Sequence, residues 1–187
     1  MNIVLFGPPG AGKGTQAKSL VDKLKSFQIS TGDILRDEIK KDSDVGKRII
    51  NYMNEGKFVD DEIVNKIIKN IIYDPNKKNK LIFDGYPRTI EQAKNLDIWL
   101  NDTNQKINYI FFLNVNRETI IKRIEKRKIL EKRSDDDLNT IIKRYDKYMD
   151  TTKPVLDYYS DKSNFKEIDG SLEIDQITSK ISSILKV

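Results

Sequence analysis

The sequence predicts an α/β protein with a doubly wound, five-stranded parallel sheet that carries a glycine-rich phosphate loop. Two observations predict this fold class. Apolar runs of strand length alternate with segments of helical periodicity along the chain of 187 residues, as in folds built from strand–helix–strand units. The first run, residues 3–6, shows no polar alternation, which is typical of a strand buried on both faces of a parallel sheet.

Taken in order, the apolar runs predict strands at residues 3–6, 28–30, 80–85, 109–115 and 164–169. The segments between them have the periodicity of helices, most regularly at residues 63–72, where Ile and Val recur every four positions. Capping side chains mark several helix starts: Ser30, Asp60, Thr89, Asn116 and Ser134. Asp33 and Gln92 each stand three residues after such a cap, which is the spacing of a capping box.

The glycine loop lies between the first strand and the first helix and reads GPPGAGKGT over residues 7–15. Residues 7–13 fit the pattern G-x-x-x-x-G-K, in which backbone N–H groups and a helix N-terminus surround phosphate oxygens. Gly14 stands where the general pattern has Ser or Thr, and the hydroxyl comes one place later, at Thr15. A simple turn with an exposed lysine is the alternative, but the matching flanks favour phosphate binding. The residues assigned to this role are Gly10, Ala11, Gly12, Lys13, Gly14 and Thr15.

Composition limits the chemistry. There is no Cys and no His, so disulfides, a thiolate nucleophile, a His general base and a Cys/His zinc site are excluded. The net charge of +5 arises from lysines interspersed with acids, a surface that also favours polyanionic ligands. Met1 leads directly into a core strand, with no signal peptide or long apolar segment. We therefore expect a cytoplasmic protein that does not interact with a membrane.

An acid at the end of a buried strand is the candidate metal ligand. Asp84 ends the predicted strand at residues 80–85, where carboxylates often approach the Mg²⁺ of a nucleotide site. A strand-terminating Asp-Gly turn is the alternative, and the glycine loop favours the metal role. We assign Asp84 and Asp33 to Mg²⁺, through water.

Four segments together resemble the nucleoside monophosphate kinases, and among them the adenylate kinases most closely. They are residues 7–15, residues 30–36 (STGDILR), residues 84–89 (DGYPRT) and residues 133–136 (RSDD). With arginines at positions 123, 127 and 144, the likeness spans nearly the whole chain in order and spacing. The aromatic residue of the third segment is Tyr86, where Phe is more common in the family.

The resemblance implies a division of the chain into a core (1–29, 60–121 and 138–187), a helical AMP-binding flap (30–59) and a short lid (about 122–137). Only five residues separate Arg127 from Arg133, whereas relatives with a long lid insert a β-rich subdomain there, so no structural zinc is expected. The implied ATP contacts, beyond the glycine loop, are Arg123, Arg127 and Leu172. The implied AMP contacts are Thr31, Arg36, Lys57, Phe58, Val59, Gly85, Tyr86, Pro87, Arg88, Gln92, Arg133 and Arg144. The catalytic set is Lys13, Arg88, Arg123, Arg133 and Arg144.

The implied reaction is reversible, Mg²⁺-dependent transfer of the ATP γ-phosphoryl group to AMP, giving two ADP, by a monomer that needs no nucleic acid. Arginine suits this chemistry because its rigid fork matches phosphate geometry and stays protonated. Thr31 favours AMP, since UMP/CMP kinases usually have Ala there and Asn at the position of Thr89. The open alternatives are another nucleoside monophosphate kinase, a GTP-dependent one, a nucleic-acid-associated ATP-binding protein and a catalytically silent nucleotide-binding module.

Overall fold

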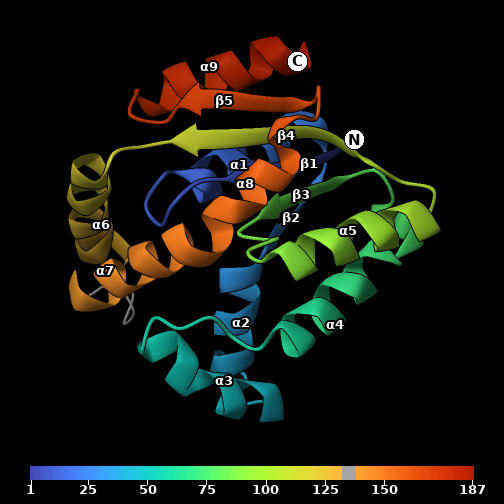
Figure 1. The fold of residues 1–187 in the computed structure, drawn as a ribbon. Helices are drawn as coiled ribbons and strands as arrows, with labels where there is room; N and C mark the ends of the chain where they lie inside the picture. The colour runs from blue at the N-terminus through green and yellow to red at the C-terminus, as the bar shows by residue number, and fades with distance from the viewer. Residues whose placement is uncertain (132–137) are drawn as a thin grey trace.

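The computed structural model describes residues 1–131 and 138–187. Its centre is a five-stranded parallel sheet, which confirms the predicted fold class (Figure 1). The strand order is β2-β3-β1-β4-β5. The strands are β1 (Asn2–Phe6), β2 (Phe27–Ser30), β3 (Leu81–Asp84), β4 (Ile107–Asn114) and β5 (Phe165–Asp169).

Helices cover both faces of this sheet. On one face α1 (Lys13–Leu24) contacts α9 (Ile174–Leu185), and on the other α5 (Ile90–Asp102) contacts both α4 (Asp61–Ile72) and α8 (Lys153–Ser160). The remaining helices are α2 (Thr31–Lys40), α3 (Asp44–Asn54), α6 (Arg117–Glu131) and α7 (Leu138–Lys147). Within the described part of the chain, no helix combines the length and the apolar character that crossing a bilayer requires.

Strand β1 shows why the sequence pattern lacks alternation. Val4 and Phe6 pack into the core on the α4–α5–α8 side, while Ile3 and Leu5 pack into the core on the α1–α9 side. All four side chains are buried. A strand between two helical layers has no solvent-facing side, so residues 3–6 are apolar on both faces.

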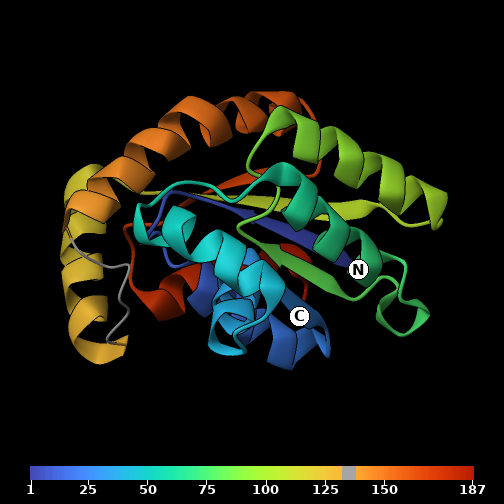
Figure 2. The ribbon, with the colours of Figure 1, turned by 90° about the horizontal axis from the view of Figure 1, so that it is seen from below.

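Two helix pairs extend beyond the sheet. Helices α2 and α3 project below it, and α6 and α7 stand beyond the carboxyl ends of the strands, as Figures 1 and 2 show. Gly46 permits close packing of α2 on α3, because a Cβ atom built there would lie 2.2 Å from the carbonyl oxygen of Glu38. Helices α2 and α3 lie within the predicted flap (30–59). The predicted lid (about 122–137) takes in the second part of α6 and residues 132–137, which lie outside the described part of the chain.

The structure confirms four of the predicted helix caps. The side chains of Ser30, Asp60, Thr89 and Asn116 each accept a hydrogen bond from a backbone N–H of the first helical turn. Only half of the capping box at Thr89 forms: the Thr89 hydroxyl accepts from the Gln92 N–H, but the Gln92 side chain bonds Asp61 and the Arg88 N–H. Ser134 lies outside the described residues.

One helical feature was not predicted. A π-helical turn, η2 (Tyr148–Thr152), joins α7 to α8. Pro154 lies in the first turn of α8, lacks an N–H group and cannot make the regular bond to the carbonyl of residue 150. A widened turn accommodates this lost bond.

Candidate active site

The glycine loop connects the carboxyl end of β1 to the start of α1, and its backbone has positive φ angles at Gly7, Gly10 and Gly12. Gly10 has φ +83°, and a Cβ atom there would lie 2.8 Å from Cγ1 of Ile124 on α6. Gly12 has φ +93°, and a Cβ atom there would meet nothing within 4 Å. The loop is therefore closely packed against α6 at one point and open at the start of α1, where the helix N–H groups favour anions.

Lys13 is the cation of this loop. Its Nζ donates to the carbonyl oxygens of Gly7 at 2.7 Å and Pro8 at 3.0 Å. The pKa of Lys13 is lowered from 10.5 to about 8, mainly by burial and also by the charges of Arg88 and Arg127, while the charge of Asp84 acts in the opposite direction. A cation held at a disfavoured position beside other cations is suited to receive phosphate oxygens.

Asp84 lies where three predicted elements meet. Its position at the end of β3 is opposite Leu5 in β1 and Ser30 in β2. The Asp84 Oδ2 atom accepts a hydrogen bond from Gln28 at 3.0 Å and lies 3.4 Å from the place of a Cβ atom on Gly14. The carboxylate therefore faces the glycine loop from the neighbouring strand.

The two predicted metal ligands, Asp84 and Asp33, fit Mg²⁺ only in part. Among the described residues no group of three or more acidic side chains could hold a metal by itself. Mg²⁺ in nucleotide sites is bound through one or two carboxylates, the substrate phosphates and water, and Asp84 can supply such a carboxylate. Asp33 is engaged elsewhere, because its Oδ1 atom accepts from Arg36 at 2.5 Å.

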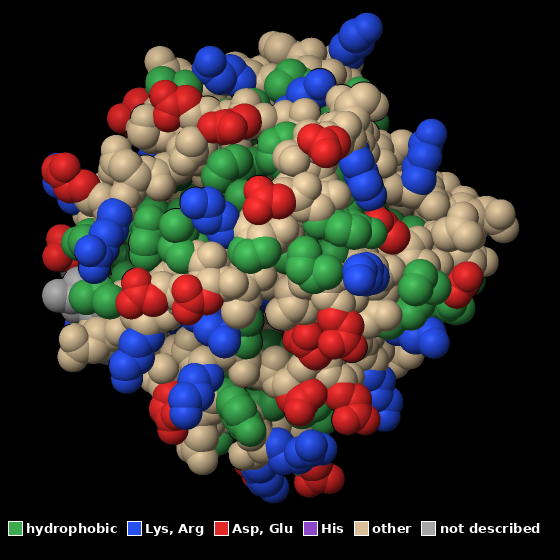
Figure 3. Space-filling view, in the orientation of Figure 1, with side chains coloured by type: hydrophobic (Ala, Val, Ile, Leu, Met, Phe, Trp, Pro, Cys, Tyr) green, Lys and Arg blue, Asp and Glu red, His purple; other side chains and the backbone are tan. Residues whose placement is uncertain are grey.

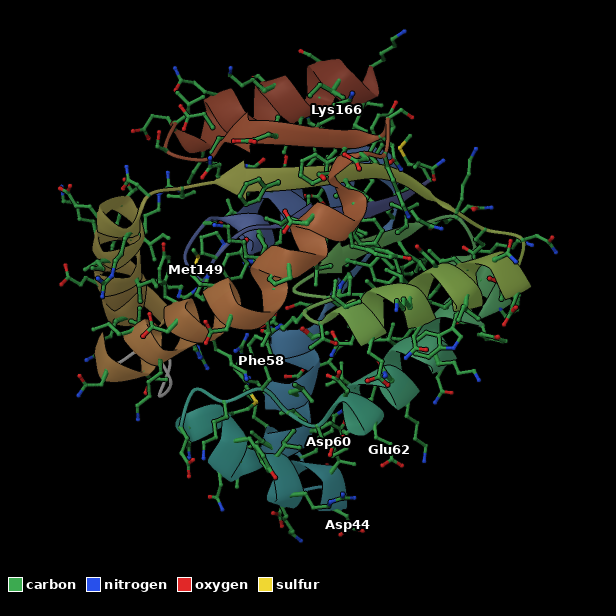
Figure 4. All side chains as sticks on the ribbon, in the orientation of Figure 1. Asp44, Phe58, Asp60, Glu62, Met149 and Lys166 are labelled. Carbon is green, nitrogen blue, oxygen red and sulfur yellow. The ribbon has the colours of Figure 1, made fainter. Side chains whose placement is uncertain are left out.

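A small cavity beside Asp84 is lined by half of the predicted AMP contacts. It measures about 20 Å³. Three stretches of the chain line it, residues 31–35, 58–64 and 85–92. The lining residues are Thr31, Leu35, Phe58, Val59, Val64, Gly85, Arg88 and Gln92. In Figure 4 Phe58 lies between the α2–α3 pair and the helices above it.

Arg88 occupies the centre of this arrangement. Its Nε donates to the carbonyl oxygen of Gly85 at 2.7 Å, and Nη2 donates to the Thr31 hydroxyl at 3.3 Å. Its guanidinium carbon lies 4.8 Å from the ring centroid of Phe58. Burial, followed by the nearby charge of Arg144, lowers the pKa of Arg88 to about 10. The guanidinium is thus held by carbonyl, hydroxyl and ring, all of which are weaker partners than a phosphate.

The predicted ATP contacts Arg123 and Leu172 are brought together. Arg123 on α6 donates through Nη1 to the Gly170 carbonyl at 2.6 Å and through Nη2 to the Leu172 carbonyl at 3.0 Å. The side chain thereby joins α6 to the loop between β5 and α9. Arg127, one turn further along α6, is close enough to influence the pKa of Lys13.

Arg144 joins the flap to α7. Its Nη2 donates to the Met53 carbonyl at 3.5 Å, and Gly56 permits this approach, because a Cβ atom there would lie 3.0 Å from Cγ2 of Thr140. Since Arg144 also lowers the pKa of Arg88, α7 places a second guanidinium near the cavity.

Five of the predicted AMP contacts in the described part of the chain do not line the cavity: Arg36, Lys57, Tyr86, Pro87 and Arg144. Lys57 is largely exposed and its Nζ lies 2.6 Å from the Glu55 carboxylate. Tyr86 is a core residue, 1% exposed, whose hydroxyl donates to Asn65 and to the Gln92 carbonyl. Pro87, joined to it by a cis peptide bond, is buried beside it. Arg133 lies outside the described residues.

Sequence reasoning missed Leu35 and Val64, which line the cavity, and Asp61, which accepts a hydrogen bond from Gln92. The two apolar residues belong to helical stripes and read as ordinary core positions. The acid reads as an ordinary first-turn residue. No local signal separated these roles.

Comparison with known proteins gives one consistent result. The family model described as "Adenylate kinase" matches residues 5–164. Proteins named adenylate kinase are 50% identical in Pelagibacter ubique and 41% identical in Mycoplasma mycoides, each alignment covering the whole of both chains. A relative of that name from Nocardioides is 36% identical over the whole of this chain and 98% of its own. Together with the glycine loop and the cavity that Arg88 lines, these matches show that the chain belongs to the adenylate kinase family.

Proposed function

We propose that this chain catalyses reversible transfer of the γ-phosphoryl group of ATP to AMP, yielding two ADP. The observation that carries the proposal is the convergence of Thr31, Phe58, Val59, Gly85, Arg88 and Gln92 on one cavity next to the glycine loop. These residues come from three segments far apart in sequence, and each was expected to contact AMP.

The reaction needs positioning and charge compensation more than it needs covalent help. A phosphate oxygen of AMP attacks the γ-phosphorus of ATP, the bond to the β–γ bridging oxygen breaks, and ADP leaves as the second product. The attacking phosphate is already largely ionised at neutral pH, so no general base is required. That agrees with a chain that has no His.

The residues divide the work by position. The N–H groups of residues 10–15 and the Lys13 ammonium bind the donor phosphates, with Arg123 and Arg127 on α6. Arg88, Arg36 and Arg144 bind the AMP phosphate, and Arg133 extends this set from the lid. Leu172 contacts the adenine of ATP through its backbone, which Arg123 positions.

Mg²⁺ belongs to the proposed reaction as the companion of ATP, where it neutralises charge on the β- and γ-phosphates. Asp84 would hold it through water, and Asp33 would contribute only after releasing Arg36.

We also propose a short-lid monomer of the cytoplasm with a core, a flap at residues 30–59 and a lid at about 122–137. The relatives differ in overall length, since alignment with the Pelagibacter protein spans 213 positions and alignment with the Nocardioides protein spans 187.

The test measures ADP formed by the purified protein with Mg²⁺ and ATP, offering AMP, UMP, CMP, GMP and dTMP separately beside a control without acceptor. We expect turnover of about 1–10³ s⁻¹ with AMP and slow ADP formation in the control. Preference for UMP or CMP would overturn the roles of Thr31 and Gln92. Failure of every acceptor would refute the proposed reaction.

A further inference from the structure

Asp61 carries the inference, although no sequence motif includes it. It is the first residue of α4, and its carboxylate reaches the start of α5. The Oδ1 atom accepts a hydrogen bond from Nε2 of Gln92, and Oδ2 accepts one from the Thr89 hydroxyl at 2.9 Å. Asp61 therefore contacts the cavity only through Gln92.

The other end of the Gln92 amide is held as well. Its Oε1 atom accepts a hydrogen bond from the backbone N–H of Arg88 at 2.7 Å. A carboxylate can only accept and a backbone N–H can only donate. Rotating the amide by half a turn would place its oxygen against the carboxylate and its NH₂ against the N–H, so the two partners permit one orientation.

The rest of Gln92 is equally fixed. Its backbone N–H donates to the Thr89 hydroxyl at 3.2 Å, and its carbonyl accepts from the Tyr86 hydroxyl at 3.3 Å. The residue is 2% exposed. Neither the position nor the orientation of the amide can adapt to a ligand without breaking several of these contacts.

This orientation has a consequence for the nucleotide base. An amide has two N–H donors and two acceptor lone pairs, and Asp61 and Arg88 use one of each. One donor and one acceptor in a fixed arrangement remain for a ligand. Adenine presents a 6-amino donor beside ring-nitrogen acceptors, whereas guanine presents a 6-oxo acceptor in the same place.

We propose that Asp61 is a positioning residue that makes the acceptor site select adenine over guanine by fixing the orientation of the Gln92 amide. The inference rests on the proposed function, in which Gln92 contacts the base of AMP. With the amide fixed, its remaining oxygen faces the 6-amino group of adenine and would oppose the 6-oxo group of guanine. If the amide could turn, guanine would be accommodated equally well.

The experiment replaces Asp61 by Asn and measures kcat and KM for AMP and GMP at saturating ATP. The amide of D61N can either donate or accept, so it no longer selects one orientation of Gln92. D60N is the matched control, because it removes the same charge at the same end of α4 (Figure 4). Among the described residues, the Asp60 side chain accepts a hydrogen bond from the Glu62 N–H and makes none to Gln92. Asn also remains a good N-cap there.

We expect D61N to lower the ratio of kcat/KM for AMP to that for GMP about tenfold, mainly through a higher KM for AMP. The KM for ATP should not change, and D60N should keep the wild-type ratio. An unchanged ratio in D61N would overturn the inference. Equal losses with both acceptors, or equal shifts in D61N and D60N, would overturn it too, because they would indicate a structural or general charge effect.

A second measurement does not depend on the variant folding or on turnover. In ¹⁵N-labelled wild-type protein, one Nε2 proton of Gln92 should resonate downfield of free amides and exchange slowly, since it is bonded to a carboxylate. A free-amide signal would refute the fixed orientation by itself. Absence of wild-type turnover with AMP would instead refute the proposed function, so the two failures can be told apart.

Discussion

Replacing Lys13 by Met should stabilise the protein at neutral pH while abolishing ATP binding. Burial lowers the pKa of Lys13 from 10.5 to about 8, so the folded chain binds this proton more weakly than the unfolded chain. The resulting destabilisation is at most about 3 kcal/mol. It is fully present below about pH 8 and disappears as the pH rises to about 10.5.

The substitution also removes two hydrogen bonds, which reduces the gain. The Pro8 carbonyl keeps a partner, because it accepts from the Ala11 N–H at 3.1 Å. The buried Gly7 carbonyl loses Lys13 Nζ, which costs about 1–3 kcal/mol. The expected net gain at pH 7 is about 1 kcal/mol, a rise in Tm of about 2–4 °C.

Calorimetry at two pH values distinguishes this reasoning from simple removal of a charge. At pH 7 the Lys13→Met protein should melt above wild type. Near pH 10.5 it should melt below wild type, because the charge penalty has disappeared and the loss of the hydrogen bond to the Gly7 carbonyl still destabilises the variant. ATP should raise the Tm of wild type and leave that of the variant unchanged. The control is Lys18→Met, which alters an exposed lysine of the same helix. A variant less stable than wild type at pH 7, or one that behaves as Lys18→Met does, would refute the reasoning.

Three further substitutions test the site. Arg88→Lys keeps the charge but loses the planar fork and the contact with the Phe58 ring. The kcat with AMP should therefore fall about 10²–10³-fold, while the ATP affinity measured by titration should not change. Equal losses of kcat and of ATP affinity would contradict the assignment. Gly10→Val forces a β-branched residue to φ +83° and against Ile124, so urea unfolding should show a loss of about 1–3 kcal/mol and ATP binding should disappear. Thr31→Ala removes the hydroxyl that bonds the Gly85 carbonyl, so discrimination between AMP and UMP should weaken in the acceptor assay, and an unchanged preference would argue against a role for Thr31.

The sequence predicted the parts of the fold that depend on local chemistry. The buried strand β1, the glycine loop and the helix caps follow from patterns within a few residues, and the structure confirms them. Strand β2 was placed from Gln28 although it begins at Phe27, which is 42% exposed. An edge strand has one unpaired side and weaker burial, so its hydrophobic pattern defines its ends poorly.

The site was predictable where it rests on motifs and unpredictable where it rests on long-range geometry. Arg88 and Thr31 lie in recognisable segments, and the pairing of β2 with β3 brings these segments together. Asp61 contacts Gln92 across thirty-one positions, and nothing near either residue indicates the other. Only half of the predicted capping box at Thr89 forms for the same reason, because the carboxylate of a different helix determines where the Gln92 amide nitrogen lies.

The cations of the site share one arrangement that links binding to opening of the cavity. Lys13, Arg88 and Arg123 each donate to backbone carbonyls, and Arg36 donates to Asp33. The carbonyl partners hold Lys13, Arg88 and Arg123 near their expected positions, so little ordering remains when phosphate oxygens arrive and form stronger, charge-assisted bonds. Arg36 already has a charged partner in Asp33. Wherever a phosphate replaces the Gly85 carbonyl as the partner of Nε, Arg88 moves, and Arg88 lines a cavity of only about 20 Å³. We therefore expect phosphate recognition to be coupled to the opening of space for the base, so that a nucleoside without its phosphate binds far more weakly than the base contacts alone would suggest.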